Sequence, residues 1–349
     1  MTEADVVEID GSFGEGGGQI LRSSLTLSVV TGRRLHISNI RGRRAKGGLR
    51  AQHLQSVRAA AEISGARVVG DEIGSSELAF EPGPVRPGKY RFDIGTAGAT
   101  SLVLQTIALP LALAAKPSRI VITGGTHVPW APCFHYLDMQ WRPCLGQMGV
   151  TIGLDMQSAG YYPRGGGQIV ATVEPSSGVQ PLALTRRGEL KLLRCFSAVS
   201  HLPTQIAERQ AHRAERRLLE RELHPTVTVT ELPSIGPGTV LLLLAEFEGG
   251  RACYFGLGEI RKKAERVAEE AAEGLLRFLD ADATVDEYAA DQMLLPAALA
   301  TGTSEFSTPV VTEHLLTHAE VIRRFTAAEV AIDGEPGKPG RVTVKGKQQ

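Results

Sequence analysis

The stretch from Leu49 to Val69, LRAQHLQSVRAAAEISGARVV, predicts a helix followed directly by a strand. Leu54, Val57 and Ala61 are spaced three and four residues apart, so they share one face of a helix. Gly65 is typical of a residue that ends a helix in the left-handed conformation. The four residues after it include two valines, which favour a strand. Helix and strand are thus expected to form one local unit.

The same order of helix and strand recurs along the chain. It is predicted again from Tyr136 to Leu154 and from Gln205 to Thr230. Recurrence at intervals of roughly 80 residues favours a repeated α/β unit over one doubly wound sheet. The pentapeptide GGGQI also occurs twice, at 16–20 and at 165–169, and indicates either a true repeat or two unrelated glycine-rich turns.

Residues 185–280 differ in composition from the rest of the chain. They are predicted to contain a charged helix, an apolar strand and an amphipathic helix, at 205–223, 240–247 and 259–279. The apolar residues of the last helix recur every three or four positions and form one buried stripe: Ile260, Ala264, Val267, Ala271, Leu275 and Phe278. The expected fold class is α/β (α+β), with a small α/β domain at 185–280 inserted into a large domain of residues 1–184 and 281–349.

Composition excludes several classes of protein. The 349 residues carry 38 basic and 38 acidic side chains, and this zero net charge argues against coating nucleic acid by bulk electrostatics. A hydrophobic content of 42% excludes a disordered chain, and 39 glycines without a three-residue period exclude collagen. Aromatic residues make up 5%, too few for rows of base-stacking rings. The four cysteines form no Cys-x-x-Cys pair, which predicts free thiols.

Two segments indicate the cellular location. Met1 to Asp10 carries acidic residues where a signal peptide would have a basic start and an apolar stretch. The longest apolar run, from Leu102 to Ala115, is interrupted by Gln105 and Pro110 and is shorter than the roughly 20 residues of a membrane-spanning helix. We therefore expect a cytoplasmic protein with no membrane partner, and its oligomeric state stays open.

Positive charge is concentrated near the N-terminus. Residues 16–61 contain no acidic residue and nine basic ones: Arg22, Arg33, Arg34, Arg41, Arg43, Arg44, Lys46, Arg50 and Arg58. Within this stretch, RGRRAKGG at 41–48 precedes a predicted helix start. Guanidinium groups, backbone N–H groups and a helix N-terminus all suit phosphate oxygens, so 41–48 is a predicted anion-binding loop. A solvated basic loop is the alternative.

Glu15 lies in the glycine-rich segment 14–19. This segment lacks both the Gly-Lys-Ser/Thr of a Walker A loop and the strand-turn-helix context of a dinucleotide-binding loop, so ordinary nucleotide folds are not supported. One carboxylate can hold Mg²⁺ while phosphate oxygens complete the ligand shell, which makes Glu15 a candidate metal ligand. An exposed acid in a turn is the alternative.

His314 and His318 are four residues apart and would share one face of a helix, as zinc ligands do. Here, however, the glutamate precedes the first histidine, and 133–135 is the only other plausible source of ligands. A zinc site is one hypothesis. The others are that His314 is an ordinary polar residue near a strand end, or that its neutral imidazole attacks phosphorus as a nucleophile.

A series of motifs occurs in an order that resembles the RNA 3′-terminal phosphate cyclase family. The motifs are Asp10-Gly11, Gly14 to Arg22, Ile40 to Leu54, Gly95 to Gly98, Leu102 to Thr106, Gly124 to Thr126, His201 to Pro203, Ala207 to Arg209, Asp291-Gln292 and His314 to Thr317. The likeness extends from about residue 7 to about residue 330. It implies βαβαββ repeats related to enolpyruvyl transferases, with a small inserted α/β domain.

The resemblance also implies a reaction and its residues. ATP adenylates an enzyme histidine and releases pyrophosphate, AMP moves to the 3′-terminal phosphate of RNA, and the 2′-hydroxyl closes a 2′,3′-cyclic phosphate as AMP leaves. His314 matches the family histidine, and Glu15 matches the acid associated with Mg²⁺ or Mn²⁺. The ATP-binding positions match Gln105, Pro132, Tyr288, Asp291 and Gln292, and the phosphate end of the site matches Arg22, Arg41, Arg44 and Gln52. RNA with a 3′-terminal phosphate is the implied partner.

One departure and two alternatives accompany this resemblance. His318 stands where relatives often have Asn, so its contact with the active-site backbone is open. A sister branch of the family is a noncatalytic factor of ribosome assembly that lacks the histidine, and the presence of His314 favours the enzymes. An enolpyruvyl transferase would share the repeat but would need neither the histidine nor a pocket at 288–292.

Overall fold

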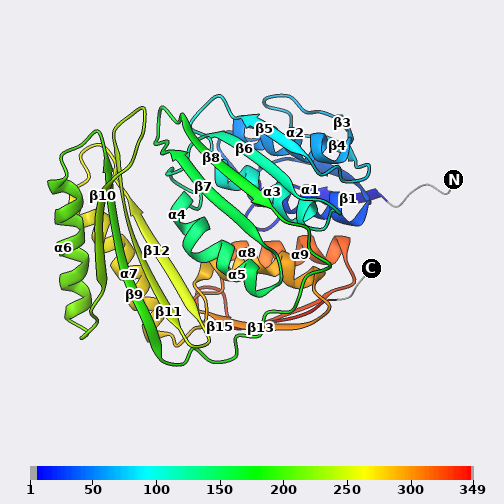
Figure 1. Ribbon diagram of the computed structural model, residues 1–349. Helices are drawn as coiled ribbons and strands as arrows, with labels where there is room; N and C mark the ends of the chain where they lie inside the picture. Colours follow the sequence, from blue (N-terminus) through cyan, green and yellow to red (C-terminus); the bar gives the residue numbers. More distant parts are fainter. Residues whose placement is uncertain (1–5, 347–349) are drawn as a thin grey trace.

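The computed structural model describes residues 6–346, so residues 1–5 of the N-terminal segment considered above lie outside it. The first unit of the fold contains β1 (Val6–Asp10), α1 (Gly18–Thr31), β2 (Arg34–Ser38), α2 (Ala51–Ser64), β3 (Arg67–Val69) and β4 (Leu78–Glu81). Its strands lie in the order β1-β2-β4-β3, with β1 and β2 parallel and the other neighbours antiparallel (Figure 1). The helix and strand predicted within 49–69 are α2 and β3.

The second unit repeats this arrangement. It contains β5 (Lys89–Asp93), α3 (Thr100–Ala112), β6 (Ser118–Gly124), α4 (Phe134–Tyr136), η1 (Leu137–Trp141), α5 (Arg142–Gln147), β7 (Ile152–Ser158) and β8 (Gly167–Val173). Here α4, η1 and α5 form one continuous helical stretch with a π-helical middle. The strand order is β5-β6-β8-β7, again with only the first pair parallel. The repeated βαβαββ unit is thereby confirmed.

The third unit is assembled from two separate parts of the chain. Its later elements are α8 (Glu287–Leu299), β13 (Gly302–Thr308), α9 (Glu313–Phe325), β14 (Glu329–Asp333) and β15 (Gly340–Gly346), in the sheet order β13-β15-β14. The place of a first parallel strand is taken by 179–183, where Val179 pairs with Ala300 and Ala183 with Glu305 in parallel bridges. The unit is therefore interrupted after its first extended segment.

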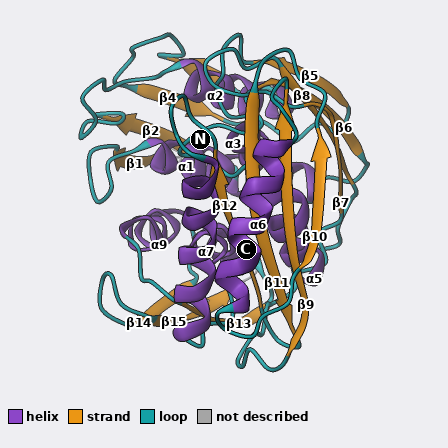
Figure 2. Ribbon diagram, turned by 90° about the vertical axis from the view of Figure 1, so that its left-hand side faces the viewer, coloured by secondary structure: helices purple, strands orange, loops and turns teal. Residues whose placement is uncertain are grey.

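The elements between these two parts form a fourth sheet. They are β9 (Leu190–Ser200), α6 (Gln205–Leu219), β10 (Thr226–Glu231), β11 (Gly238–Phe247), β12 (Arg251–Leu257) and α7 (Ala264–Asp280), with the strand order β10-β9-β11-β12. Figure 2 shows α6 and α7 side by side in front of these strands. This arrangement supports the predicted insertion, whose boundaries at 185 and 280 stay a prediction.

The side chains of β11 explain why its sequence is apolar throughout. Leu241 and Leu243 belong to a hydrophobic cluster with α6 and α7, whereas Leu242 and Leu244 belong to the main core. Successive side chains of a strand point to opposite faces, so a strand that is covered on both faces lacks the usual polar alternation. The inserted sheet is thus packed between its own helices and the large part of the molecule.

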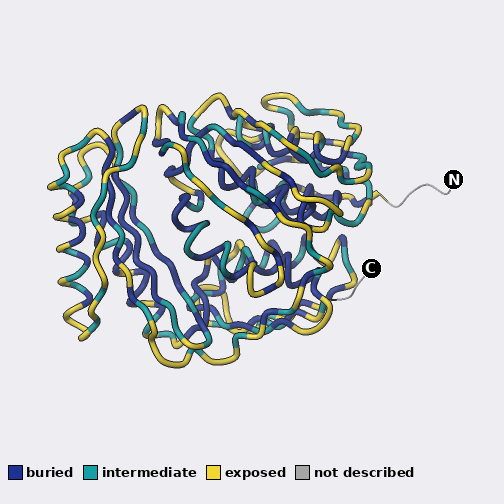
Figure 3. Tube along the Cα trace, in the orientation of Figure 1, coloured by how far each residue is buried: buried dark blue, intermediate teal, exposed yellow. Residues whose placement is uncertain are grey.

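Helices from different units pack together in the interior, and this packing positions the candidate site. Helix α1 contacts α2, α3 and α9, and α8 contacts α9. Figure 1 shows α8 and α9 lying on the sheet that contains β13 and β15, and Figure 3 shows that most residues of these helices are buried. The N-terminal ends of α1 and α9 therefore come close to the middle of α8.

One expectation from the sequence is wrong, and one question that the sequence left open is answered. Ile260 is 92% exposed instead of lining the buried stripe, because α7 begins only at Ala264 with Lys263 as its N-cap. The second GGGQI, at 165–169, leads into strand β8, whereas the first, at 16–20, leads into helix α1. The pentapeptide is therefore no structural repeat, since the flanking residues decide which element follows.

Two other expectations concern the thiols and the membrane. The four cysteines are buried with free thiols, as predicted. Within residues 6–346, none of the helices combines the length and the apolar composition that crossing a bilayer requires.

Candidate active site

The glycine-rich loop before α1 is packed tightly against α9. Gly14 has a φ of +52°, and a Cβ there would lie 2.2 Å from Thr317 Oγ1. At Gly17 a Cβ would lie 2.3 Å from both carboxylate oxygens of Glu15. A Cβ at either position would force the neighbouring side chain to shift. The backbone N–H of Glu15 donates to Thr317 Oγ1 at 3.0 Å, and the Glu15 side chain is held inward, where it is 9% exposed.

His314 lies in the first turn of α9. Thr312 caps this helix by accepting a hydrogen bond from the backbone N–H of Leu315 at 3.0 Å. The preceding strand, β13, ends at Thr308, and Thr312 and Glu313 separate the histidine from the loop that follows this strand. The side chain of His314 is 53% exposed, which leaves part of the ring open to a substrate.

Gln19 and Asp291 determine which nitrogen of His314 is available. The amide nitrogen of Gln19 donates to Asp291 Oδ1, and Gln19 Oε1 accepts from His314 Nδ1 at 2.9 Å. Because an ionised carboxylate only accepts hydrogen bonds, the amide oxygen of Gln19 must face the histidine. Nδ1 therefore carries the proton, and Nε2, which lies 3.8 Å from Glu15 Oε1, has the free lone pair.

The charge state of His314 suits a nucleophile. Burial lowers its pKa below the ordinary value, the Asp291 carboxylate acts in the opposite direction, and the cations of Arg22 and Arg44 lower it further. The net direction is downward, so the imidazole is neutral near pH 7. A neutral imidazole keeps the lone pair that an attack on phosphorus requires.

Asp291 is supported by His318. Nδ1 of His318 donates to Asp291 Oδ1 at 2.9 Å and also lies 3.0 Å from the backbone oxygen of the same residue. Burial alone would raise the pKa of Asp291, but the hydrogen bonds from His318 and Gln19 and the nearby imidazole of His314 outweigh it, so its pKa is lowered. His318 thus contacts both the side chain and the backbone of a candidate site residue.

Two of the predicted arginines, Arg44 and Arg22, lie at the glycine loop, and Arg41 is close enough to Arg22 to lower its pKa. Arg44 forms an ion pair with Glu15 Oε1. Arg41 has a φ of +56°, and its Nη1 donates to the backbone oxygens of Lys46 at 2.8 Å and Gly48 at 3.0 Å, which closes the basic loop on itself. Burial lowers the pKa of Arg22 to about 10, against the attraction of Asp291, and this arginine is still a cation near pH 7.

His53 is a site residue that the sequence did not single out. A Cβ at Gly18 would lie 2.3 Å from His53 Nε2 and 2.7 Å from Arg22 Nη1, so both side chains meet at the start of α1. Burial, followed by the cations of Arg22, Arg41 and Arg50, lowers the pKa of His53 to about 3. His53 is therefore a neutral neighbour within the basic cluster. Gln19 was also missed as a site residue.

Two glutamines connect the site to α3. Gln52 Oε1 accepts from the backbone N–H of Ala99 at 3.0 Å, which ties α2 to the start of α3. Nε2 of Gln105, in the middle of α3, donates to Gln292 Oε1 at 2.8 Å. Gln292 follows Asp291 on α8, so this pair extends the site from the histidine along α8.

Tyr288 presents an exposed ring on α8. It is 51% exposed, and its ring packs edge-on against Tyr136, with centroids 6.3 Å apart and an interplanar angle of 87°. Burial raises the pKa of Tyr288 to about 12, so its hydroxyl stays protonated at neutral pH. Pro132 is half-buried just before α4, the helix that contains Tyr136. The two residues predicted to face adenine thus come from neighbouring elements.

The zinc hypothesis gains no support from this geometry. Among residues 6–346, no group of three or more His, Cys, Asp or Glu side chains is placed to hold a metal ion. A metal bound by protein side chains alone is therefore not indicated within the described residues.

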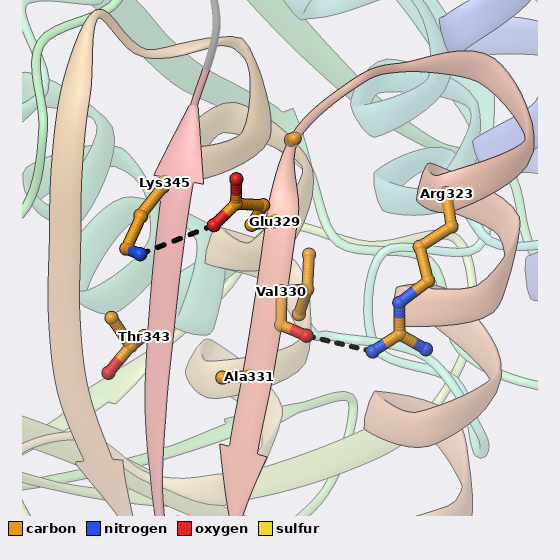
Figure 4. Close-up of a pocket in the computed structure, with 7 residues that line it drawn as sticks. Arg323, Glu329, Val330, Ala331, Thr343 and Lys345 are labelled. Carbon is orange, nitrogen blue, oxygen red and sulfur yellow. Dashed lines mark hydrogen bonds and ion pairs between the residues drawn. The ribbon is translucent and has the colours of Figure 1, made fainter.

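Cavities also occur away from the histidine. One of about 360 Å³ lies between α9 and strands β14 and β15, lined by Arg323, Ala328, Glu329, Val330, Ala331, Thr343 and Lys345 (Figure 4). In it Arg323 Nη2 donates to Val330 O at 2.8 Å, and Lys345 Nζ lies 3.2 Å from Glu329 Oε2. Another of about 620 Å³ is lined by 200–203 and 231–234. Neither contains a predicted site residue.

Comparison with known proteins agrees with the motif pattern. The sequence model of the family described as "RNA 3'-terminal phosphate cyclase" matches residues 13–332. A protein with this description from Pseudomonas fluorescens is 47% identical over 327 residues, which cover 93% of this chain and 94% of the relative. One from Ralstonia nicotianae is 44% identical, with 96% of each chain covered. One from Archaeoglobus fulgidus is 44% identical and covers 94% of this chain and 98% of its own.

Among solved structures, an enolpyruvyl transferase from Streptomyces tendae matches 49% of this chain and 33% of its own length, with 18% identity and a TM-score of 0.28.

Proposed function

This chain belongs to the RNA 3′-terminal phosphate cyclase family, and we propose that it uses ATP to convert the 3′-terminal phosphate of RNA into a 2′,3′-cyclic phosphate. The observation that carries the proposal is the fixed ring of His314. Its Nδ1–H is bound by Gln19, so Nε2 is left with a free lone pair beside Glu15 and the basic loop.

In the first step, Nε2 of His314 attacks the α-phosphorus of ATP. An N–P bond forms, the bond from this phosphorus to the oxygen of the leaving group breaks, and pyrophosphate departs. The imidazole gains positive charge as it bonds to phosphorus, so its Nδ1–H donates more strongly to Gln19. Asp291 holds Gln19 in place and offsets part of this charge.

In the second step, an oxygen of the RNA 3′-phosphate attacks the phosphorus of the histidine-bound AMP. The N–P bond breaks, its electron pair returns to Nε2, and a phosphoanhydride joins RNA to AMP. In the third step, the 2′-hydroxyl oxygen attacks the phosphorus of the 3′-phosphate, AMP leaves, and the hydroxyl proton passes to water. Hydroxyl and phosphate sit on neighbouring carbons, so proximity favours this ring closure.

The cations at the site would neutralise phosphate charge in each displacement. Arg22, Arg41 and Arg44 present guanidinium groups, whose paired N–H donors match phosphate oxygens. Arg44 is already directed to the site by its ion pair with Glu15. In a partly enclosed site, such fixed charges stabilise the developing negative charge more strongly than water does.

Glu15 fits a role as ligand to Mg²⁺ or Mn²⁺. Its Oε1 faces Arg44, whereas its Oε2 is buried and has no hydrogen-bond partner among the described residues. A single free carboxylate oxygen suits a cation that takes its other ligands from phosphates and water. When bound, the ion would withdraw negative charge from the ATP phosphates.

The exposed ring of Tyr288 and the half-buried Pro132 would enclose the adenine of ATP. Gln105 and Gln292, joined by their hydrogen bond, offer amide groups beside them. Aromatic faces bind purines without charge, and amides supply the directional contacts.

A noncatalytic RNA-assembly factor on the same fold is the competing proposal. Such a protein would need neither a neutral histidine with one nitrogen held by Gln19 nor a carboxylate oxygen kept free beside it. The arrangement around His314 therefore favours the enzyme.

Incubation with ATP labelled in the α-phosphate, together with Mg²⁺ or Mn²⁺, tests the proposal. We expect covalent AMP on the protein, in a linkage that acid cleaves and base does not. His314→Ala is expected to lose the label, and His36→Ala, which alters a histidine on β2, is expected to keep it. Equal labelling of His314→Ala would contradict the assignment. RNA ending in a 3′-hydroxyl should not be consumed, whereas RNA ending in a 3′-phosphate should.

A further inference from the structure

We propose that two exposed rings, Trp130 and Tyr162, form a stacking surface for the bases that precede the 3′-terminal nucleotide of a single-stranded RNA. This inference rests on the proposed function, because it names how that substrate is held. Trp130 is 99% exposed and Tyr162 is 73% exposed. Both belong to loops of the second unit, outside the residues assigned above.

The backbone at Trp130 is in an unfavourable conformation. Its φ is +65°, in the left-handed region that bulky residues rarely adopt. The ring is fully exposed, so no burial within the protein offsets this backbone strain. Strain of this kind concentrates where a ligand is bound. Trp130 is therefore directed outward by its loop and available to a partner.

The loops that contain the two rings are joined side by side. Gly160 O accepts from the backbone N–H groups of Thr126 at 2.9 Å and His127 at 3.0 Å. His127 and Tyr161 form a parallel bridge, and their rings lie 5.4 Å apart. Because the bridge is parallel, both chains leave it in the same direction. Trp130 follows His127 by three residues, and Tyr162 follows Tyr161 directly.

The Trp130 loop runs between the two ends of the candidate site. It begins at Gly125, which bridges to Ala99, the residue whose backbone N–H is bound by Gln52 at the phosphate end. It ends at Pro132, at the proposed nucleotide pocket. The loop thus connects the phosphate end of the site to the proposed nucleotide pocket, and in the proposal the nucleotides that precede the terminal one lie along it.

Charge near the second ring also suits RNA. Arg164 follows Tyr162 by two residues, is exposed, and is held in place by a hydrogen bond from its Nη1 to Ile235 O at 3.1 Å. Its guanidinium is available to a backbone phosphate. Single-stranded RNA is bound by stacking of its unpaired bases on aromatic rings, with cations at the phosphates. Two rings hold two bases, which fits an enzyme that binds only the end of its substrate.

The kinetic test compares two decamer RNAs that end in a 3′-phosphate and differ only in two abasic nucleotides before the terminal one. For Trp130→Ala/Tyr162→Ala we expect KM for the intact decamer to rise at least about tenfold, with kcat little changed, because stacking contributes to binding. The parent and the double variant should have equal KM for the abasic decamer. Trp130→Phe should retain most of the affinity. Ile260→Ala is the control, because Ile260 is a nonaromatic residue of the inserted unit that is 92% exposed. This variant should behave as the parent.

The outcomes separate this inference from the proposed function. Covalent labelling by ATP should be the same in the double variant as in the parent, because the two rings act on RNA and not on ATP. If the parent itself takes no label, the proposed function is overturned. An equal rise in KM on both RNAs, or no rise, would overturn the stacking surface.

Fluorescence provides a direct measurement of binding. The chain has two tryptophans, and Trp141 is 5% exposed, so Trp130 is the ring that solvent and RNA can reach. Adding the intact decamer without ATP should quench the emission of the parent but not of Trp130→Phe. Equal quenching in both contradicts contact at Trp130. If Trp130→Ala instead separates a dimer in sedimentation velocity and leaves KM unchanged, the surface joins copies of this chain and the RNA proposal fails.

Discussion

Gln19 Oε1 accepts a hydrogen bond from His314 Nδ1 at 2.9 Å, and this contact decides which nitrogen of the histidine is free. The orientation of Gln19 is itself decided by Asp291, which accepts from its amide nitrogen. Gln19 is thus a positioning residue: it acts on the substrate only through His314. The consequences of this relationship can be measured.

Gln19→Ala should slow covalent labelling by about tenfold to a hundredfold in a single turnover, because the ring loses its fixed orientation. The KM for ATP should change much less. Gln168→Ala is the matched control, since Gln168 is the glutamine of the second GGGQI and its Nε2 donates to Thr123 Oγ1 on the paired strand β6 at 3.3 Å. Equal slowing in both variants would show that Gln19 has no special role.

The pH dependence of labelling should reflect the lowered pKa of His314. The neutral ring is the nucleophile, so the rate should fall on the acid side with a midpoint below the ordinary value of 6.5. Arg44→Gln removes a cation that lowers this pKa, so the pKa rises and the midpoint moves to higher pH. The ratio of initial rates at about pH 6 and about pH 8 measures the shift. A midpoint that moves down in Arg44→Gln contradicts the assignment.

Gly17→Ala should impair the reaction while the protein stays folded. The added Cβ would lie 2.3 Å from both oxygens of Glu15, so the carboxylate must move. We expect a higher Mg²⁺ requirement in the labelling assay. In Gly146→Ala nothing lies within 4 Å of the added Cβ. Because Gly146 lies in helix α5, that control should gain up to about 1 kcal/mol in the free energy of unfolding. A Gly17→Ala protein with parental metal dependence would contradict the role of Glu15.

His318→Ala should destabilise the protein. It removes buried hydrogen bonds to the ionised Asp291, and such a loss lowers the free energy of unfolding by about 1.5 to 3 kcal/mol. His318→Asn supplies a shorter amide donor and should recover part of the loss. Urea unfolding monitored by circular dichroism measures both variants. Identical midpoints for His318→Ala and the parent would show that this contact adds nothing to stability.

Much of the architecture could be predicted because its signals are local. The spacing of apolar residues in 49–64 and the glycine at 65 identified α2 and its end, and the same pattern identified the repeat. The continuous apolar residues of 240–247 predicted the strand that is observed as β11. Ile260 shows the limit of such signals. Its spacing matched the apolar stripe of α7, but the helix begins four residues later, because apolar spacing does not fix the residue at which a helix begins.

The sequence by itself determined the repeated helix and strand units, the basic acid-free stretch and the chemical types at the site, because periodicity and motif spacing depend on neighbouring residues. Only the tertiary structure brought Gln19 to Asp291 and His314, which are 272 and 295 positions away. It likewise placed 179–183 beside β13, although the inserted elements separate these two segments in the sequence. Such contacts follow from the packing of whole helices and sheets, and no local pattern encodes the partner of a buried polar side chain.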